Sequence, residues 1–173
     1  MSIPATPSLT SPLPLPAATS AGAPAGRQRV VLDTNVCLDL FVFRDPRWAA
    51  LQAALEQGTV QAYTREDCRS EWLAVLDYPH LPVTPETKPA ICAEFDRLLQ
   101  CLPLAQVNTF GLPVCTDRDD QKFLELALQC QAHVLVSKDK AVLKLGKRTV
   151  KRGLFAIVPP QLWRADAFLD PAT

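Results

Sequence analysis

VVLDTNV, residues 30–36, begins with a short apolar run rich in β-branched residues and continues into an acid and two small polar residues. The lack of polar alternation predicts a strand covered on both faces, as in a parallel sheet flanked by helices. Ligands of such sheets bind beyond the carboxyl ends of the strands, where Asp33 lies. Thr34 and Asn35 would turn the chain and cap the next helix. Taken alone, Asp33 is better explained as an ordinary acid beside a helix cap, so the rest of the chain must supply partners.

Length and composition indicate one folded domain. The chain has 173 residues, 48% of them hydrophobic, which is enough for one core and too short for two ordinary domains. Residues 1–28 are rich in Pro, Ala, Ser and Thr and predict a disordered tail, which leaves 29–170 as the domain. The formal net charge is zero, so nucleic-acid binding would require a local basic patch.

The cysteines and histidines argue against a disulfide framework or a zinc site. The six cysteines form no CxxC pair and are mostly within apolar patterns, which favours reduced residues in the core. Only two histidines, His80 and His133, are available to a metal. The chain has no apolar run long enough to span a membrane and no secretory signal, so we expect a cytoplasmic protein.

Strands and helices alternate along the rest of the chain. Further strands are expected at 59–63, 102–107, 133–137 and 154–158. Helices are expected at 36–42, 45–58, 64–77, 91–101, 116–131, 140–145 and 160–169, with a capping box at Thr64 and a stop at Gly146. This alternation predicts a three-layer α/β/α sandwich with a mostly parallel sheet.

The second informative stretch is CTDRDDQKFLELALQCQAHVLVSKDKAVL, residues 115–143. It combines an acid cluster, an amphipathic helix and a buried strand that again ends at an acid, Asp139. If this strand is a neighbour of the first one, Asp33 and Asp139 face one crevice. Helical spacing places Asp120 on the apolar face of its helix, and Glu71 points partly inward from the 64–77 helix.

The acids Asp33, Glu71, Asp120 and Asp139 would repel one another strongly if they met. A hard divalent cation with oxygen ligands relieves such repulsion, which implies Mg²⁺ or Mn²⁺. The alternative is that these acids form ion pairs with nearby cations and make no site. The cations considered are Arg65, Arg69, Lys138 and Lys140.

VVLDTNV, RSEWLAVLDYP (residues 69–79) and the 115–143 stretch together resemble the three acidic blocks of PIN domains, specifically of bacterial toxin components of toxin–antitoxin systems. The resemblance implies a sheet of about five parallel strands and a metal-dependent endoribonuclease acting on RNA. It also implies a small antitoxin partner and a homodimer. It makes Asp33, Glu71, Asp120 and Asp139 the metal-binding and catalytic acids, with Asn35 and Ser137 as polar supports.

Two features depart from the family pattern. Relatives often have Asp-Pro-Asp-Asp where this chain has residues 117–120, DRDD, and a shift of one residue would exchange Asp119 for Asp120. A small residue is frequent where Lys138 precedes the fourth acid. Lys138 would either pair with an acid or contact a phosphate.

A local basic run follows Asp139 and could supply RNA affinity, although it also suits an ordinary solvated surface. Its members are Lys138, Lys140, Lys144, Lys147, Arg148, Lys151 and Arg152. Trp48, Trp72 and Trp163 have helical spacings that favour core packing over base stacking. A dehalogenase-like phosphatase would need a second Asp at Asn35. The remaining rival is a catalytically weak or inactive PIN-like module that binds RNA or protein.

Overall fold

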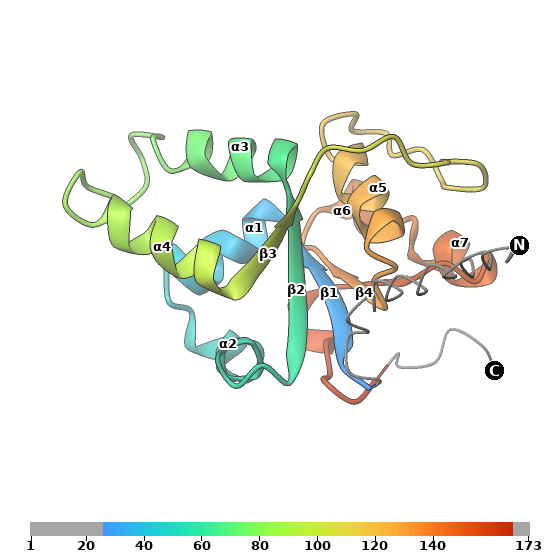
Figure 1. Ribbon diagram of the computed structural model, residues 1–173, viewed down its shortest axis with the longest axis horizontal. Coiled ribbons are helices and arrows are strands. Elements are labelled where there is room, and N and C mark those ends of the chain that lie inside the picture. Colours follow the sequence, from blue (N-terminus) through green and yellow to red (C-terminus); the bar gives the residue numbers. More distant parts are fainter. Residues whose placement is uncertain (1–25, 168–173) are drawn as a thin grey trace, which may run out of the picture.

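Five strands form one parallel sheet in the order β3-β2-β1-β4-β5 (Figure 1). The computed structural model describes residues 26–167. Every neighbouring pair of strands is parallel, as the alternation of strands and helices predicted. The strands are β1 (Gln28–Leu32), β2 (Val60–Arg65), β3 (Leu99–Leu102), β4 (Val134–Val136) and β5 (Ala156–Val158).

The first strand is the centre of the sheet. β1 pairs with β2 on one side and with β4 on the other, so it has no free edge. Val30 and Val31 are both fully buried, and they pack into different hydrophobic clusters on opposite faces. Burial on both faces explains why the run lacks polar alternation.

Helices cover both faces of the sheet, which confirms the α/β/α sandwich. On one side lie α1 (Thr34–Cys37), the π-helical η1 (Leu38–Val42), η2 (Pro46–Trp48), α2 (Ala49–Glu56) and α4 (Lys88–Leu98). On the other lie α5 (Gln121–Gln129), α6 (Lys140–Leu143) and α7 (Gly146–Lys151) (Figure 1). α3 (Glu66–Val75) contributes to both sides, because Cys68 packs in one cluster and Trp72 in the other.

Several predicted boundaries were wrong. The helix expected at 91–101 ends at Leu98, and β3 takes residues 99–102 because Leu99 pairs with Ala62 of β2. Residues 103–107, expected in a strand, have no regular structure. Thr64 belongs to β2 and forms no capping box, since the N-cap of α3 is Arg65 without a side-chain cap. The ends of these helices and strands depend on which strands pair, and the local sequence does not reveal that pairing.

Two predictions near the C-terminus also failed. Gly146 does not stop a helix but begins α7, so the basic residues that follow lie on a helix instead of a turn. The helix expected at 160–169 is only the short 3₁₀ helix η3 (Pro160–Leu162) within the part of the chain that is described. Trp163 instead leaves the helix and buries its ring, with Nε1 donating to Gln28 Oε1 at 2.8 Å.

The expected core positions are confirmed for the tryptophans and only in part for the cysteines. Trp48, Trp72 and Trp163 are buried. All six cysteines are free, but the buried ones are Cys37, Cys68 and Cys115, while Cys92 and Cys130 are half-buried and Cys101 is exposed. Within residues 26–167 no helix has both the length and the apolar character needed to cross a membrane. Most of the expected tail lies outside the described residues. Gln28, its last residue, is buried in β1.

Candidate active site

Asp33 and Ser137 meet at the carboxyl ends of two adjacent strands. β1 and β4 are paired with Leu32 opposite Val136, so the next residue on each strand lies at the same edge of the sheet. Ser137 Oγ donates a hydrogen bond to Asp33 Oδ2 at 2.5 Å. The neighbouring strands that the sequence analysis required are therefore present.

Asp33 is buried, and it is itself the N-cap of α1. Its carboxylate accepts from the backbone and the side-chain amide of Asn35, the latter at 3.0 Å. The cap is thus Asp33 and not the Thr34–Asn35 pair that was predicted. Burial raises the pKa of Asp33, although the hydrogen bond from Ser137 acts in the opposite direction. The hydrogen bonds therefore hold the Asp33 carboxylate in place but do not fully offset the effect of burial on its pKa.

Ser137 joins Asp33 to Asp139. Its hydroxyl oxygen accepts from the Asp139 backbone N–H at 3.0 Å while it donates to Asp33. Asp139 caps α6 by accepting from the backbone N–H groups of Ala141 and Val142 at 2.6 and 3.2 Å. Asn35 completes the link, because its Oδ1 accepts from the Lys138 backbone N–H at 3.2 Å. Asn35 and Ser137 thus hydrogen-bond both to Asp33 and to the segment that carries Asp139.

Asp120 stands at the N-terminus of α5 and makes no capping hydrogen bond. Burial, together with the charges of Asp33, Asp139, Asp117 and Glu71, raises its pKa to about 7. Asp119, the alternative third acid, is exposed, whereas Asp120 is half-buried. The register that turns Asp120 inward is the one that helical spacing predicted.

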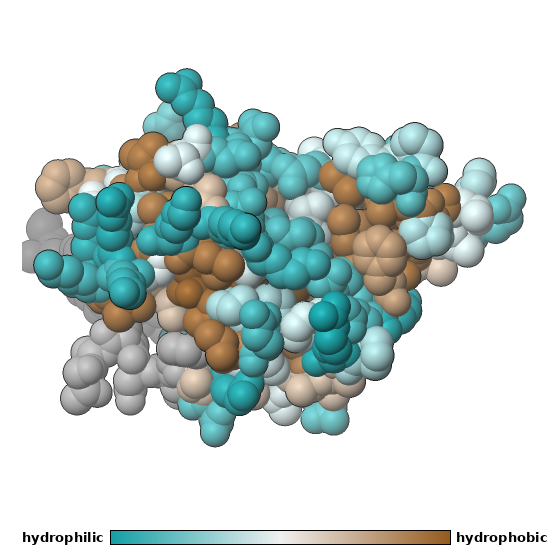
Figure 2. Space-filling model, turned by 180° about the vertical axis from the view of Figure 1, so that it is seen from behind, coloured by the Kyte–Doolittle hydropathy of each residue, from teal (hydrophilic) through white to brown (hydrophobic). Residues whose placement is uncertain are grey.

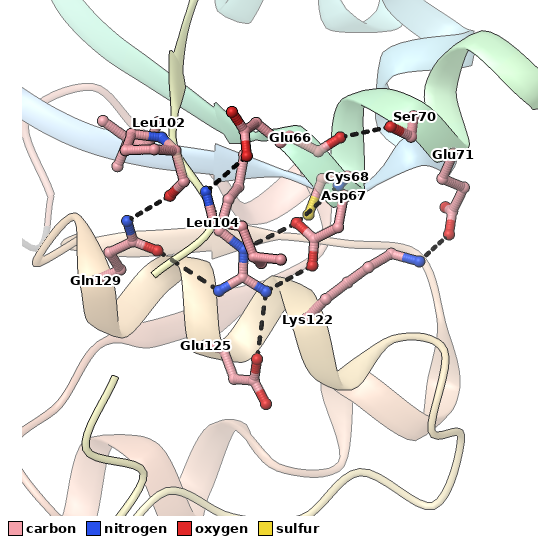
Figure 3. A network of polar contacts seen from close by, with 12 residues as sticks. Glu66, Asp67, Cys68, Ser70, Glu71, Leu102, Leu104, Lys122, Glu125 and Gln129 are labelled. Atoms are coloured by element: carbon pink, nitrogen blue, oxygen red, sulfur yellow. Dashed lines mark hydrogen bonds and ion pairs between the residues drawn. The ribbon is translucent and has the colours of Figure 1, made fainter. Parts of the chain in front are cut away.

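Glu71 reaches the same region from α3. Its Oε1 accepts from Thr34 Oγ1 at 2.6 Å, and its Oε2 forms an ion pair with Lys122 of α5 (Figure 3). Lys122 was not among the residues predicted at the site. Its position two residues after Asp120, at the start of the same amphipathic helix, is the feature of the sequence that could have indicated it.

The alternative prediction, that the four acids form ion pairs with Arg65, Arg69, Lys138 or Lys140, is wrong for these four cations. Arg65 is buried and pairs with Asp67 and Glu125 (Figure 3), while Arg69 pairs with Asp96. Lys138 pairs with Asp39, and Lys140 makes no ion pair with any described residue. Among residues 26–167, Lys122 is the one Lys or Arg side chain that pairs with any of the four acids.

Sequence reasoning missed Asp39, a buried acid that lies beside the site. It accepts from Trp48 Nε1 at 3.0 Å and from Lys138 Nζ at 2.6 Å. Its position inside the apolar sequence LDLFV was the available signal, since a lone acid in such a run needs donors. Of the two roles considered for Lys138, pairing with an acid is the one observed, although the acid is not one of the predicted four.

The other predicted RNA-binding residues lie along α6 and α7. Lys140, Lys144, Lys147, Arg148 and Lys151 are all exposed and make no ion pair within the described chain. Figure 2, which shows the molecule from behind, has hydrophilic side chains gathered at the end that carries α7 in Figure 1. Arg152 folds back and donates to the carbonyl of Gly111.

The four acids have the right chemistry for a hard divalent cation. All supply carboxylate oxygens, and burial, with a smaller contribution from neighbouring acids, raises the pKa of Asp33 and of Asp120. As the side chains stand, however, no three His, Cys, Asp or Glu residues between 26 and 167 form a group placed to hold a metal ion. Glu71 engages both its oxygens with Thr34 and Lys122, so a metal ion bound by Glu71 would have to replace one of these contacts.

The chain was also compared with known proteins. A family model described as a PIN domain matches residues 29–141. That range begins within β1 and ends just after Asp139, so it contains all four acids. No curated protein matches the chain.

Proposed function

The chain belongs to the PIN-domain family, whose members are generally nucleases that typically use divalent metal ions, and we propose that it is a Mg²⁺- or Mn²⁺-dependent endoribonuclease. The observation that carries this proposal is the hydrogen-bond network in which Ser137 links Asp33 to the Asp139 backbone at the carboxyl ends of β1 and β4, within the range that the PIN-domain model matches. Four acids from separate elements lie in that range. Asp33 follows β1, Glu71 lies on α3, Asp120 begins α5 and Asp139 follows β4. The pKa of Asp120 responds to the charges of the other three.

In this mechanism the protein residues hold and orient the reacting groups. Asp33, Glu71, Asp120 and Asp139 would bind the metal, with Ser137 and Asn35 fixing the direction of Asp33. When bound, the metal lowers the pKa of a water molecule and stabilises charge that develops on the phosphate. One of the carboxylates would accept the proton of the attacking water and direct that water at the phosphorus atom.

RNA is the proposed substrate. The exposed cations of α6 and α7 follow Asp139 directly in the chain, and a polyanion would contact them through its phosphates. The similarity of the acidic blocks to toxin components further supports a role in a toxin–antitoxin system. We extend the proposal to a small antitoxin partner, a homodimer and a cytoplasmic location on the same grounds.

The test is cleavage of labelled structured and single-stranded RNA by the purified protein with Mn²⁺ or Mg²⁺. Asp33→Asn and EDTA should abolish cleavage, whereas Asp96→Asn, which removes an acid paired with Arg69 outside the site, should not. A folded protein that binds RNA or a partner protein and never cuts would favour the catalytically inactive PIN-like module instead. Cleavage that persists in Asp33→Asn would contradict the proposed site.

A further inference from the structure

Phe110 lies on a turn of the long loop, residues 103–119, that joins β3 to α5. It is 93% exposed, the highest value of any large apolar residue in the part of the chain that the structure describes. Figure 1 shows the loop running from the end of β3 over α5 and out toward α7. Phe is among the residue types most often buried, so a ring left in water needs a cause in the loop or in a ligand.

The backbone is held in place on both sides of Phe110. Asn108 Oδ1 accepts from the Phe110 backbone N–H at 3.0 Å, and the Leu112 N–H donates to the Thr109 carbonyl at 2.9 Å. Gly111 has a φ of +82°, which side chains rarely adopt, and Leu112 is buried in the core cluster beneath the loop. Because the turn is fixed, the fold presents the ring outward and little backbone entropy is left to lose when a ligand binds.

The turn is attached to the most basic part of the chain. Arg152, which follows α7, donates to the carbonyl of Gly111, the residue next to Phe110. All charged residues of the stretch 140–164 are Lys or Arg, and those on α7 are exposed. Loop residues 103–114 have no charged side chain that could offset them. An exposed aromatic ring thus lies beside a surface of positive charge.

An exposed aromatic ring beside exposed cations is the combination that binds single-stranded nucleic acid. Unpaired bases stack on the ring while Lys and Arg contact the phosphates, whereas the bases of a duplex are already stacked on one another. Leu104 and Val114 of the same loop are also exposed, which would suit a protein partner. The excess of positive charge beside the ring favours a polyanion instead.

We propose that Phe110 is a stacking platform for an unpaired base of single-stranded RNA, whose phosphates contact the cations of α7. The choice of RNA rests on the proposed function, and the inference deepens that function by specifying an unpaired segment of the substrate. Binding at Phe110 involves no covalent step and no metal ion. It can therefore be measured separately from cleavage.

The experiment measures binding of labelled oligouridine by fluorescence anisotropy in EDTA. A second probe has the same ribose-phosphate backbone without bases, and a third is the oligouridine annealed to oligoadenosine. Phe110→Ala should bind oligouridine about five- to hundredfold more weakly than the wild type, as expected for the loss of one stacked base. On the abasic and duplex probes Phe110→Ala should bind like the wild type, because their phosphates are present but no unpaired base is. Its thermal unfolding should also match, since the ring is exposed.

Further variants separate stacking from apolar contact. Phe110→Trp keeps an aromatic face and should stay within about threefold of the wild type, whereas Phe110→Leu should lose almost as much affinity as Phe110→Ala. Because Trp48, Trp72 and Trp163 are buried, Phe110→Trp introduces an exposed indole, whose fluorescence oligouridine should quench and the abasic probe should not. Phe43→Ala is the matched control, since it removes a 51% exposed Phe outside the loop, and it should bind like the wild type.

Several results would overturn the inference. They are unchanged binding of oligouridine by Phe110→Ala, an equal loss on the abasic probe, and full affinity in Phe110→Leu. If Phe110→Ala changes only the self-association of the protein in sedimentation, the turn is a protein contact and the inference is equally wrong. In each case metal-dependent cleavage by the wild type would leave the nuclease function standing. A wild type that neither binds nor cleaves RNA would overturn both, and one that shows the stacking pattern without ever cutting would overturn the nuclease function alone.

Discussion

The Ser137 hydroxyl donates a 2.5 Å hydrogen bond to Asp33 although the two residues are 104 positions apart in the chain. The bond is possible because β1 and β4 are adjacent and parallel, which brings their carboxyl ends together. Through the Asp139 backbone N–H, the same hydroxyl also fixes the loop that carries the fourth acid. One small side chain thus sets the relative positions of two proposed metal ligands.

Ser137→Ala should destabilise the fold and weaken metal binding. The substitution leaves the buried Asp33 oxygen without its donor, an effect that typically costs about 1–3 kcal/mol of unfolding free energy. It also removes a hydrogen bond that lowers the pKa of Asp33, so that pKa should rise further and the carboxylate should be a poorer ligand near neutral pH. Urea unfolding and Mn²⁺ titration measure the two effects. The control is Ser70→Ala, whose hydroxyl donates only to the Glu66 carbonyl on an exposed helix face. Equal stability of both variants would contradict the prediction.

Asp120 should make the stability of the metal-free protein depend on pH. Its pKa is raised from 3.8 to about 7 in the folded state, so folding favours the protonated form. The stabilisation is fully present below about pH 4 and is lost as the pH rises through 7. Asp120→Asn should therefore unfold at a higher temperature than wild type at pH 8 in EDTA, with a much smaller difference at pH 4.

The matched control for Asp120 is Asp119→Asn, which neutralises an exposed neighbour. Thermal unfolding followed by circular dichroism at pH 4, 6 and 8 supplies the measurement. If Asp119→Asn reproduces the pH-dependent gain and Asp120→Asn does not, the assignment of the inward-facing acid is reversed.

Arg65→Met should destabilise the protein by about 2–4 kcal/mol. The guanidinium is 1% exposed and binds Asp67, Glu125 and Gln129, so its loss leaves half-buried acids of α3 and α5 without a cation (Figure 3). Partial exposure of both acids keeps the loss below that of a fully buried pair. Denaturant unfolding is the measurement. Arg69→Met, which breaks the more exposed pair with Asp96, should lose less than about 1 kcal/mol, and a comparable loss in the two variants would rule out this account.

The basic helices should contribute to RNA affinity through phosphates. Replacing Lys144, Lys147 and Arg148 together by Gln should weaken RNA binding in EDTA and reduce the steepness of its salt dependence. These residues are exposed and unpaired within the described chain, so the fold should be unaffected. Binding is followed by fluorescence anisotropy at several salt concentrations. Lys88→Gln provides a control outside this surface, and an unchanged salt slope in the triple variant would exclude α6 and α7 from the interface.

The local sequence determined the central strand, the sandwich class and the inward-facing acids. Burial on both faces of β1 leaves a continuous apolar run, and helical period turns Asp120 toward the core, so both can be read from neighbouring residues alone. The PIN resemblance added the number of strands and the order of the acidic blocks. Where the strand and helix signals were both weak, as at residues 99–102, pairing with β2 decided the structure and the prediction failed.

Only the tertiary structure decided which charges meet. The ion pair of Lys122 with Glu71 and that of Lys138 with Asp39 join segments distant in sequence, and their partners depend on how helices pack against the sheet. Local periodicity says which face of a helix is buried, but not which helix lies opposite. The four acids were therefore named from the sequence as a prediction, while the pairing of Lys122 with Glu71 depends on α3 and α5 lying side by side.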